Sequence, residues 1–292
     1  MNSVTETVES LVQRLGHATA LDRVAKPLGD AVSKLVEPRS RKDLLSGTWL
    51  GHPLHPMLTD VPIGFWTSAL VLDLLGGKSS RKASDALIAV GVVAALPTAA
   101  AGLSDWSDTL GEERRIGVAH AGGNVVALAC YTTSLVLRRR GKRVKGVAVS
   151  LLGAAAATVG GYLGGHLAYR NGVNVDRNAW RHGSDEWTDL VSEAELGAGE
   201  PAVVQVGDEN VLLLRDSAGI VAIGDVCSHA GGPLHEGSVA DGCVTCPWHG
   251  SVFRLADGGV VHGPATGPQP AYDVRVIGGR VSVRRRRGPS LR

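Results

Sequence analysis

The sequence is poor in the residues that usually build one large soluble core. Aromatic residues make up 4% of the 292 residues and charged residues 20%, whereas glycine alone occurs 39 times. A chain of this length has room for about two domains of ordinary size. The composition therefore favours a helical bundle rich in small residues together with a second, compact domain.

Cysteine and charge of one sign are also scarce, and each shortage excludes a class of protein. The formal net charge is only +2, so we expect no nucleic acid partner, because a phosphate-binding surface needs a clustered excess of lysine and arginine. Four cysteines are too few for a secreted scaffold built on disulfides. The first 20 residues carry charges where a signal peptide needs an apolar core, so no signal peptide is expected.

Long apolar runs, in contrast, fill the middle of the chain. They lie at residues 57–75, 83–103, 116–137 and 144–169. Each run is long enough to cross roughly 30 Å of hydrocarbon as a helix. A buried bundle in a soluble protein is the alternative, since alanine and glycine make the runs only moderately hydrophobic. Gly160 and Gly164 are four residues apart, as are Gly161 and Gly165. This spacing favours the membrane bundle, because it lets helices approach closely in lipid.

The two ends of the chain have a different character. Residues 1–50 mix charges with leucine and valine at helical spacing and predict amphipathic surface helices. After a polar linker at 170–186, short alternating runs at 187–285 predict a small antiparallel all-β domain. A basic tail follows at 286–292. The expected fold class is multidomain, with an all-α four-helix transmembrane bundle at 51–169 followed by a small all-β domain.

Loop charges predict how the bundle is oriented. The loops after the first and third apolar runs together hold nine basic residues, whereas the loop between them has Arg114 and Arg115 with three acidic neighbours. By the positive-inside rule the two basic loops are cytoplasmic. We therefore expect a multi-pass protein of the bacterial cell membrane with its β domain on the extracytoplasmic side.

Three of the four cysteines and three of the ten histidines gather within residues 226–253. Cys227 and His229 are separated by one residue, and Cys246 and His249 by two. Zinc is an alternative, but zinc fingers usually separate paired cysteines by two residues or more and place their histidines on a helix. Two hairpin loops that each give one thiolate and one imidazole fit a 2Fe-2S cluster with two cysteine and two histidine ligands.

These loops resemble a Rieske domain of the ferredoxin type. The segments that carry the resemblance are CSHAGGPLHEG, CPWHGSVFRLADGGVVHGPAT and YDVRV. The resemblance implies a 2Fe-2S cluster in which Cys227 and Cys246 ligate one iron, and His229 and His249 the other. It also implies that residues 263–270, GPATGPQP, form a proline loop over the cluster.

Departures from the Rieske proteins of cytochrome bc complexes bear on the reduction potential. The two extra cysteines that form a disulfide there are Gly232 and Trp248 here. Ser251 keeps one hydroxyl donor, whereas Phe253 lacks the other. The resemblance therefore implies a potential in the lower part of the Rieske range of roughly −150 to +300 mV. The missing disulfide also resembles ferredoxins that work in a reducing cytoplasm. This favours a cytoplasmic β domain, whereas the loop charges indicate the extracytoplasmic side.

Residues 51–169 resemble an uncharacterised family of four-helix bacterial membrane domains, marked by GHPLHPMLTDVPIG. In an antiparallel bundle His52, His55, Asp105, His120 and His166 reach one side of the membrane. His120 and His166 could ligate a haem from two sides, or the histidines could bind another metal or a quinone. The alternative is that they cap helix ends in the headgroup region.

Several cysteines and histidines receive no functional role from the sequence. Cys130 and Cys243 are expected to be packed cysteines, and no role is assigned to His235 or His262.

Together these features favour a membrane-anchored, Rieske ferredoxin-like protein that carries single electrons, rather than a stand-alone enzyme. The alternative is a membrane oxidoreductase whose bundle holds haem b, another metal or a quinone and exchanges electrons with the cluster. Expected partners are membrane lipid and either a redox partner protein or the quinone pool. A Rieske oxygenase would need a large soluble domain with a 2-His-1-carboxylate iron site, for which the chain has no room. A zinc-stabilised binding module would contain zinc and show no visible absorption.

Overall fold

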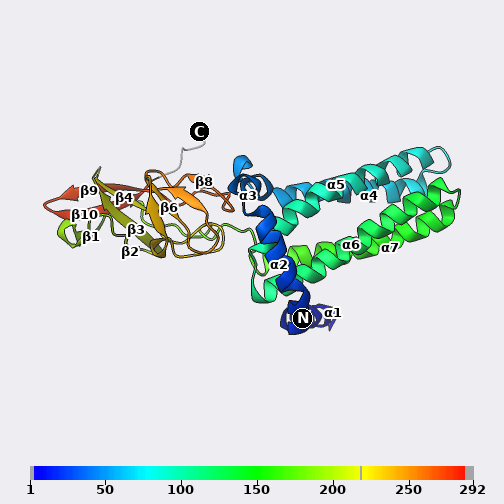
Figure 1. The fold of residues 1–292 in the computed structure, drawn as a ribbon, viewed down its shortest axis with the longest axis horizontal. Coiled ribbons are helices and arrows are strands. Elements are labelled where there is room, and N and C mark those ends of the chain that lie inside the picture. Colours follow the sequence, from blue (N-terminus) through cyan, green and yellow to red (C-terminus); the bar gives the residue numbers. More distant parts are fainter. Residues whose placement is uncertain (1–2, 218, 287–292) are drawn as a thin grey trace. The chain divides into compact units, whose positions relative to one another are not determined.

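The computed structural model describes residues 3–217 and 219–286, and the chain divides into two compact units. The first comprises Met1–Pro38 and Leu54–Val173, and the second comprises Arg39–Pro53 and Asn174–Arg292. The predicted order, an all-α bundle followed by a small all-β domain, is confirmed (Figure 1). Of the basic tail expected at 286–292, only Arg286 lies within the described residues.

Helices build the described part of the first unit. Its α-helices are α1 (Ser3–His17), α2 (Asp22–Val36), α4 (Leu54–Leu75), α5 (Arg81–Ser107), α6 (Gly111–Arg139) and α7 (Arg143–Tyr169). The last four contain the four apolar runs found in the sequence. Short loops join α4 to α5 and α6 to α7, and each of these two pairs packs side by side (Figure 1).

The long helices carry a largely apolar outer surface. Among the described helices, α4, α5 and α7 are long and apolar enough to cross a membrane. In α6, polar residues such as His120 and Asn124 interrupt the apolar run. Large apolar side chains stay exposed on the bundle, among them Val71, Val93, Leu96, Val125, Leu152 and Val159. Water is a poor solvent for so much contiguous apolar surface.

The amphipathic helices expected near the N-terminus pack on one end of the bundle. Val12 of α1 forms a small buried cluster with Ile116 of α6 and Leu163 of α7. Nearby, the Arg115 guanidinium donates to both carboxylate oxygens of Asp22, at 2.8 and 2.9 Å. The bidentate geometry makes this a strong ion pair, and it fixes the start of α2 against α6.

A buried ionic network lies at the opposite end of the bundle, where α4 and α6 end. The side chains of Arg138 and Asp73 are only 0% and 1% exposed. Arg138 donates to Asp73 at 2.5 and 2.9 Å and to Asp85 at 3.0 Å. Arg143 donates to the same two carboxylates, at 2.8 and 3.0 Å. Each of the four long helices thus contributes one charge to a single network.

Within the described residues the second unit contains one α-helix, α3 (Arg39–Ser46), three short 3-10 helices and three antiparallel sheets. Its strands are β1 (Thr188–Ser192), β2 (Ala202–Val206), β3 (Glu209–Asp216), β4 (Gly219–Gly224), β5 (Ser238–Ala240), β6 (Cys243–Thr245), β7 (Val252–Arg254), β8 (Val260–His262), β9 (Tyr272–Ile277) and β10 (Arg280–Arg285). The strand orders are β1-β10-β9, β2-β3-β4 and β5-β6-β7-β8.

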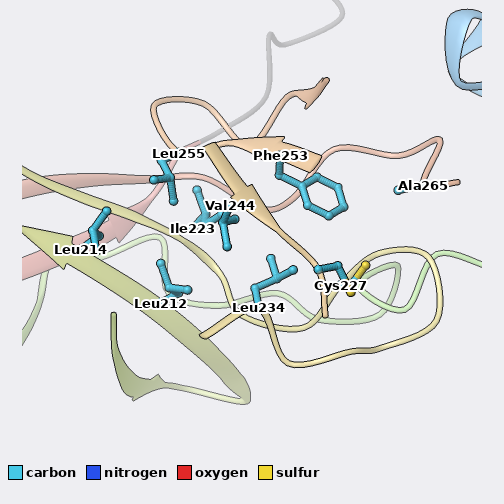
Figure 2. Close-up of a cluster of buried hydrophobic side chains, with 10 residues drawn as sticks. Leu212, Leu214, Ile223, Cys227, Leu234, Val244, Phe253, Leu255 and Ala265 are labelled. Atoms are coloured by element: carbon cyan, nitrogen blue, oxygen red, sulfur yellow. The ribbon is translucent and has the colours of Figure 1, made fainter. Parts of the chain in front are cut away.

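Strand β3 lies between two hydrophobic cores. Successive side chains of a strand point to opposite faces, and here Leu212 and Leu214 enter one cluster while Val211 and Leu213 enter the other. This explains why β3 reads as a continuous apolar run instead of an alternating one. The first cluster reaches Cys227, which in Figure 2 lies on the same side as Phe253 and Ala265, away from Leu214.

Candidate metal centre

The first candidate loop begins after β4 and turns tightly around Cys227. The Cys227 amide donates to the Gly232 carbonyl at 2.9 Å, and the Gly231 amide donates back to the Cys227 carbonyl at 2.9 Å. Gly231 has a φ of 87°, in the left-handed region that residues with a Cβ rarely adopt. The glycine four residues after the cysteine therefore lets the chain close this turn.

The second loop, between β6 and β7, repeats the same backbone pattern. The Cys246 amide donates to the Ser251 carbonyl at 2.8 Å, and the Gly250 amide donates to the Cys246 carbonyl at 3.1 Å. Gly250 also has a positive φ, 74°. Both loops thus present a cysteine at the start of a turn that a glycine closes.

The two cysteine thiols meet in the interior between the loops. Cys227 is 1% exposed and Cys246 is 3% exposed, and the two side chains hydrogen-bond each other. That hydrogen bond lowers the pKa of Cys246 to about 6, and the Trp248 and His249 amides also donate to its sulfur. The same bond and burial raise the pKa of Cys227. Amide donors that converge on sulfur favour the thiolate form, which is the form that binds metal.

The two loop histidines lie nearer the surface than the cysteines. His229 and His249 are partly exposed, and their ring centres are 5.0 Å apart with an interplanar angle of 89°. The neighbouring Trp248 side chain is 56% exposed. The loops therefore present two thiols inside and two imidazoles outside.

The two loops pack closely around the cysteine sulfurs. A Cβ placed on Gly232 would lie 2.9 Å from the Cys246 Sγ and 3.0 Å from the Trp248 Cγ, so a larger residue would crowd the site. Within the described residues no three histidine, cysteine or acidic side chains gather around one point that could hold a metal ion. The two thiols and two imidazoles do not converge on one point. They therefore fit a two-iron cluster, in which each iron takes two of them, better than a single zinc ion, which needs all four around it.

The predicted proline loop at 263–270 is hydrogen-bonded to both ligand loops. Ser228 Oγ donates to the Gly267 carbonyl at 2.7 Å, and Ser251 Oγ accepts from the Ala265 amide at 3.0 Å. Phe253, buried in the first core, offers no hydroxyl, as the sequence indicated. All four cysteines of the described chain are free, with Cys130 and Cys243 half-buried.

One contact to this loop region comes from far away in the sequence. Asp43 of α3 binds His262 Nδ1 at 2.9 Å and accepts from the Gly263 amide at 2.7 Å. Thr48 Oγ1 adds a hydrogen bond to the Ala265 carbonyl at 3.2 Å. The sequence assigned no role to His262, and its separation from Asp43 by 219 residues leaves no local signal that could have linked them.

The histidines of the helical bundle do not all come together. His55 of α4 and His120 of α6 are neighbours, with ring centres 6.3 Å apart and ring planes at 89°. His52 lies before α4 and His166 near the end of α7, and among the described contacts neither joins this pair.

The sequence analysis missed the buried network of Asp73 and Arg138. The available signal was an acidic residue in the last turn of one apolar run and an arginine at the end of another.

Comparison with known families divides the chain in the same way. Residues 186–273 match the family model for the Rieske [2Fe-2S] domain. Residues 51–177 match a family described as predicted membrane protein (DUF2231). Both resemblances found in the sequence are confirmed, and the Rieske match implies a 2Fe-2S cluster as cofactor.

Curated relatives match the C-terminal part of the chain. The anthranilate 1,2-dioxygenase ferredoxin subunit of Burkholderia cepacia is 35% identical over 98 residues, which are 34% of this chain and 91% of that protein. Apoptosis-inducing factor 3 of Mus musculus is 32% identical over 90 residues, 31% of this chain but only 15% of that protein. The solved ferredoxin of carbazole 1,9a-dioxygenase from Nocardioides aromaticivorans IC177 is 28% identical, covers 34% of this chain and 98% of that one, and has a TM-score of 0.33.

Proposed function

Because the chain belongs to the Rieske [2Fe-2S] family through its C-terminal domain, we propose that it is a membrane-anchored carrier of single electrons. The observation that carries the proposal is the pair of matching loops, which brings two buried thiols and two partly exposed imidazoles to one place. Ferredoxin components of dioxygenase systems, such as the relative from Burkholderia cepacia, support transfer to a separate redox partner protein.

In this proposal Cys227, Cys246, His229 and His249 hold the cluster, which supplies a one-electron couple when bound. The two cysteines bind through thiolates, which the loop amides stabilise by hydrogen bonds to sulfur. The two histidines are partly exposed, so an iron held by them would be the one nearer to a docked partner. Short distance to the surface favours exchange of electrons with another protein.

We further propose that the helical unit anchors the protein in a membrane. Support comes from the three long apolar helices and from the exposed valine and leucine side chains around the bundle. Inside hydrocarbon this surface has no unfavourable contact with water, and the helices satisfy their own backbone hydrogen bonds. The division at 51–169, 170–186 and 187–285 drawn from the sequence remains part of this proposal, as does a fourth span formed by α6.

The reduction potential tests the electron-carrier proposal. Purified full-length protein should show the electron paramagnetic resonance signal of a reduced Rieske cluster and titrate as a one-electron couple. Because Phe253 has no hydroxyl and no disulfide clamps the loops, we expect a potential below about +200 mV within the Rieske range. Phe253→Tyr should raise it by roughly 40 mV if its hydroxyl gives the reduced cluster about 1 kcal/mol. A wild-type value above about +200 mV would contradict the expectation.

Labelling in intact cells tests the proposed orientation. We expect Ala179→Cys, in the exposed segment after α7, to react with a membrane-impermeant thiol reagent, because the positive-inside rule places that side outside the cytoplasm. Ser79→Cys, in the exposed loop between α4 and α5, is the matched control and should react only after the cells are permeabilised. The reverse pattern would place the Rieske domain in the cytoplasm.

A further inference from the structure

Two histidines from different helix pairs face each other inside the first unit. His55 stands in the first turn of α4, and His120 stands near the start of α6. Their ring planes are at 89° to each other. They lie at the end of the bundle away from the buried network of Asp73 and Arg138. If the bundle spans a membrane as proposed, a histidine pair inside it is costly, which marks it as a candidate functional site.

Both rings are held by the same kind of hydrogen bond. His55 Nδ1 lies 2.9 Å from the Thr98 carbonyl of α5, and His120 Nδ1 lies 2.7 Å from the Gly160 carbonyl of α7. Because a carbonyl oxygen only accepts, each Nδ1 carries a proton, and in the neutral ring the lone pair is then on Nε2. Histidines that bind metal through Nε2 are typically oriented by an Nδ1–H bond to a backbone carbonyl.

Glycines on the partner helices make room for these rings. A Cβ on Gly102 of α5 would lie 2.6 Å from His55 Cε1, and a Cβ on Gly164 of α7 would lie 2.9 Å from His120 Cε1. Any larger residue would push the imidazoles out of place. Asn124 Nδ2 lies 3.3 Å from His120 Nε2 but also donates to the His120 carbonyl at 3.0 Å, so it keeps an acceptor when that nitrogen is used.

The ring separation matches that of two imidazoles on one metal. Metal–imidazole bonds are about 2.0 Å long and each ring centre lies ~1 Å beyond its nitrogen, so two rings on opposite sides of one metal are roughly 6 Å apart. The observed separation is 6.3 Å. Direct stacking of the two rings is not needed to explain their position, because each ring is anchored separately to its own helix pair.

The number of ligands selects the class of metal centre. A bare zinc or copper ion needs three or four protein ligands, and no group of three suitable side chains exists among the described residues. Haem iron needs only two axial ligands, because the porphyrin supplies the other four. We propose that His55 and His120 are the axial ligands of one haem, bound between the α4–α5 and α6–α7 helix pairs.

Hemin binding to the full-length protein tests this assignment. Protein made in haem-replete cells, or titrated with hemin, should bind one haem per chain with the absorption and electron paramagnetic resonance spectra of a low-spin, bis-imidazole iron. His55→Gly and His120→Gly should each weaken hemin binding at least tenfold or leave a high-spin iron. His52→Gly and His166→Gly are the matched controls and should keep the low-spin haem.

Two further measurements separate ligand loss from misfolding. The Rieske signal in each variant reports whether the β domain has folded. Exogenous imidazole should restore the low-spin spectrum in His55→Gly and His120→Gly, and this recovery reports that the helical bundle has folded. Absence of hemin binding in wild-type protein that carries its 2Fe-2S cluster would overturn the proposal, as would stoichiometric zinc or copper without haem. Low-spin haem that survives both substitutions, or depends on His166, would overturn it too. The haem assignment goes beyond the proposal that the cluster carries electrons. Because haem and cluster give separate signals, either proposal can fail without the other.

Discussion

Replacing Cys246 by serine should abolish the cluster. A serine hydroxyl is a hard, weakly acidic ligand, whereas iron–sulfur clusters are held by soft thiolates. We expect Cys246→Ser protein to lose the visible absorption and the reduced-state electron paramagnetic resonance signal almost completely. Iron and acid-labile sulfide analysis of the purified protein would measure the loss directly.

Cys243 provides a matched control for that experiment. It lies three residues earlier on β6 and is only half-buried, so the same chemical change leaves the proposed ligand set intact. Cys243→Ser protein should therefore keep its cluster at close to the wild-type stoichiometry. Loss of the cluster in Cys243→Ser, with retention in Cys246→Ser, would show that the ligands are wrongly assigned.

Replacing Arg138 by leucine should destabilise the helical bundle strongly. The substitution removes the fully buried partner of the Asp73 carboxylate and leaves Arg143 and Ser84 as its partners. Breaking a buried ion pair typically costs about 3–5 kcal/mol, and because Arg143 remains we expect a loss near the lower end of that range. We expect a lower unfolding temperature in detergent and less protein in the membrane fraction. The double variant Asp73→Asn/Arg138→Leu should lose less than the sum of the two single variants, because it also removes the buried carboxylate that has lost Arg138.

The neighbouring Arg139 makes the comparison specific. It is exposed at the end of α6, so Arg139→Leu removes the same charge and a side chain of the same size without touching the network. Its stability should stay within roughly 0.5 kcal/mol of wild type. Equal destabilisation by both substitutions would mean that net charge at this end of the bundle, and not the buried pairing with Asp73, decides stability.

What the sequence could predict here depends on how local each feature is. The spacing of Cys227 with His229 and of Cys246 with His249 lies within single turns, and the glycines that close those turns follow in the same loops. The four long helices were equally visible, because length and apolar composition are properties of continuous segments. Such features need no knowledge of which segments become neighbours.

Residue spacing along the sequence could not predict contacts between distant segments. Sequence reasoning paired His120 with His166, whereas the ring nearest to that of His120 belongs to His55 on the other helix pair. The pairing of Asp73 with Arg138 similarly depends on which helix ends meet. Antiparallel order predicts that such residues share a level of the bundle but not which of them touch.

The short segment Arg39–Pro53 changes how the β domain is attached to the rest of the chain. It belongs to the second unit and holds that unit through Asp43 and Thr48, although it is followed immediately by α4. The polypeptide therefore passes between the two units three times, at Pro38, at Pro53 and at Val173. A single proteolytic cut after α7 would not free the β domain, because its own hydrogen bonds would still attach it to residues 39–53. A fragment that begins at Asn174 would lack residues 39–53, which belong to the same unit.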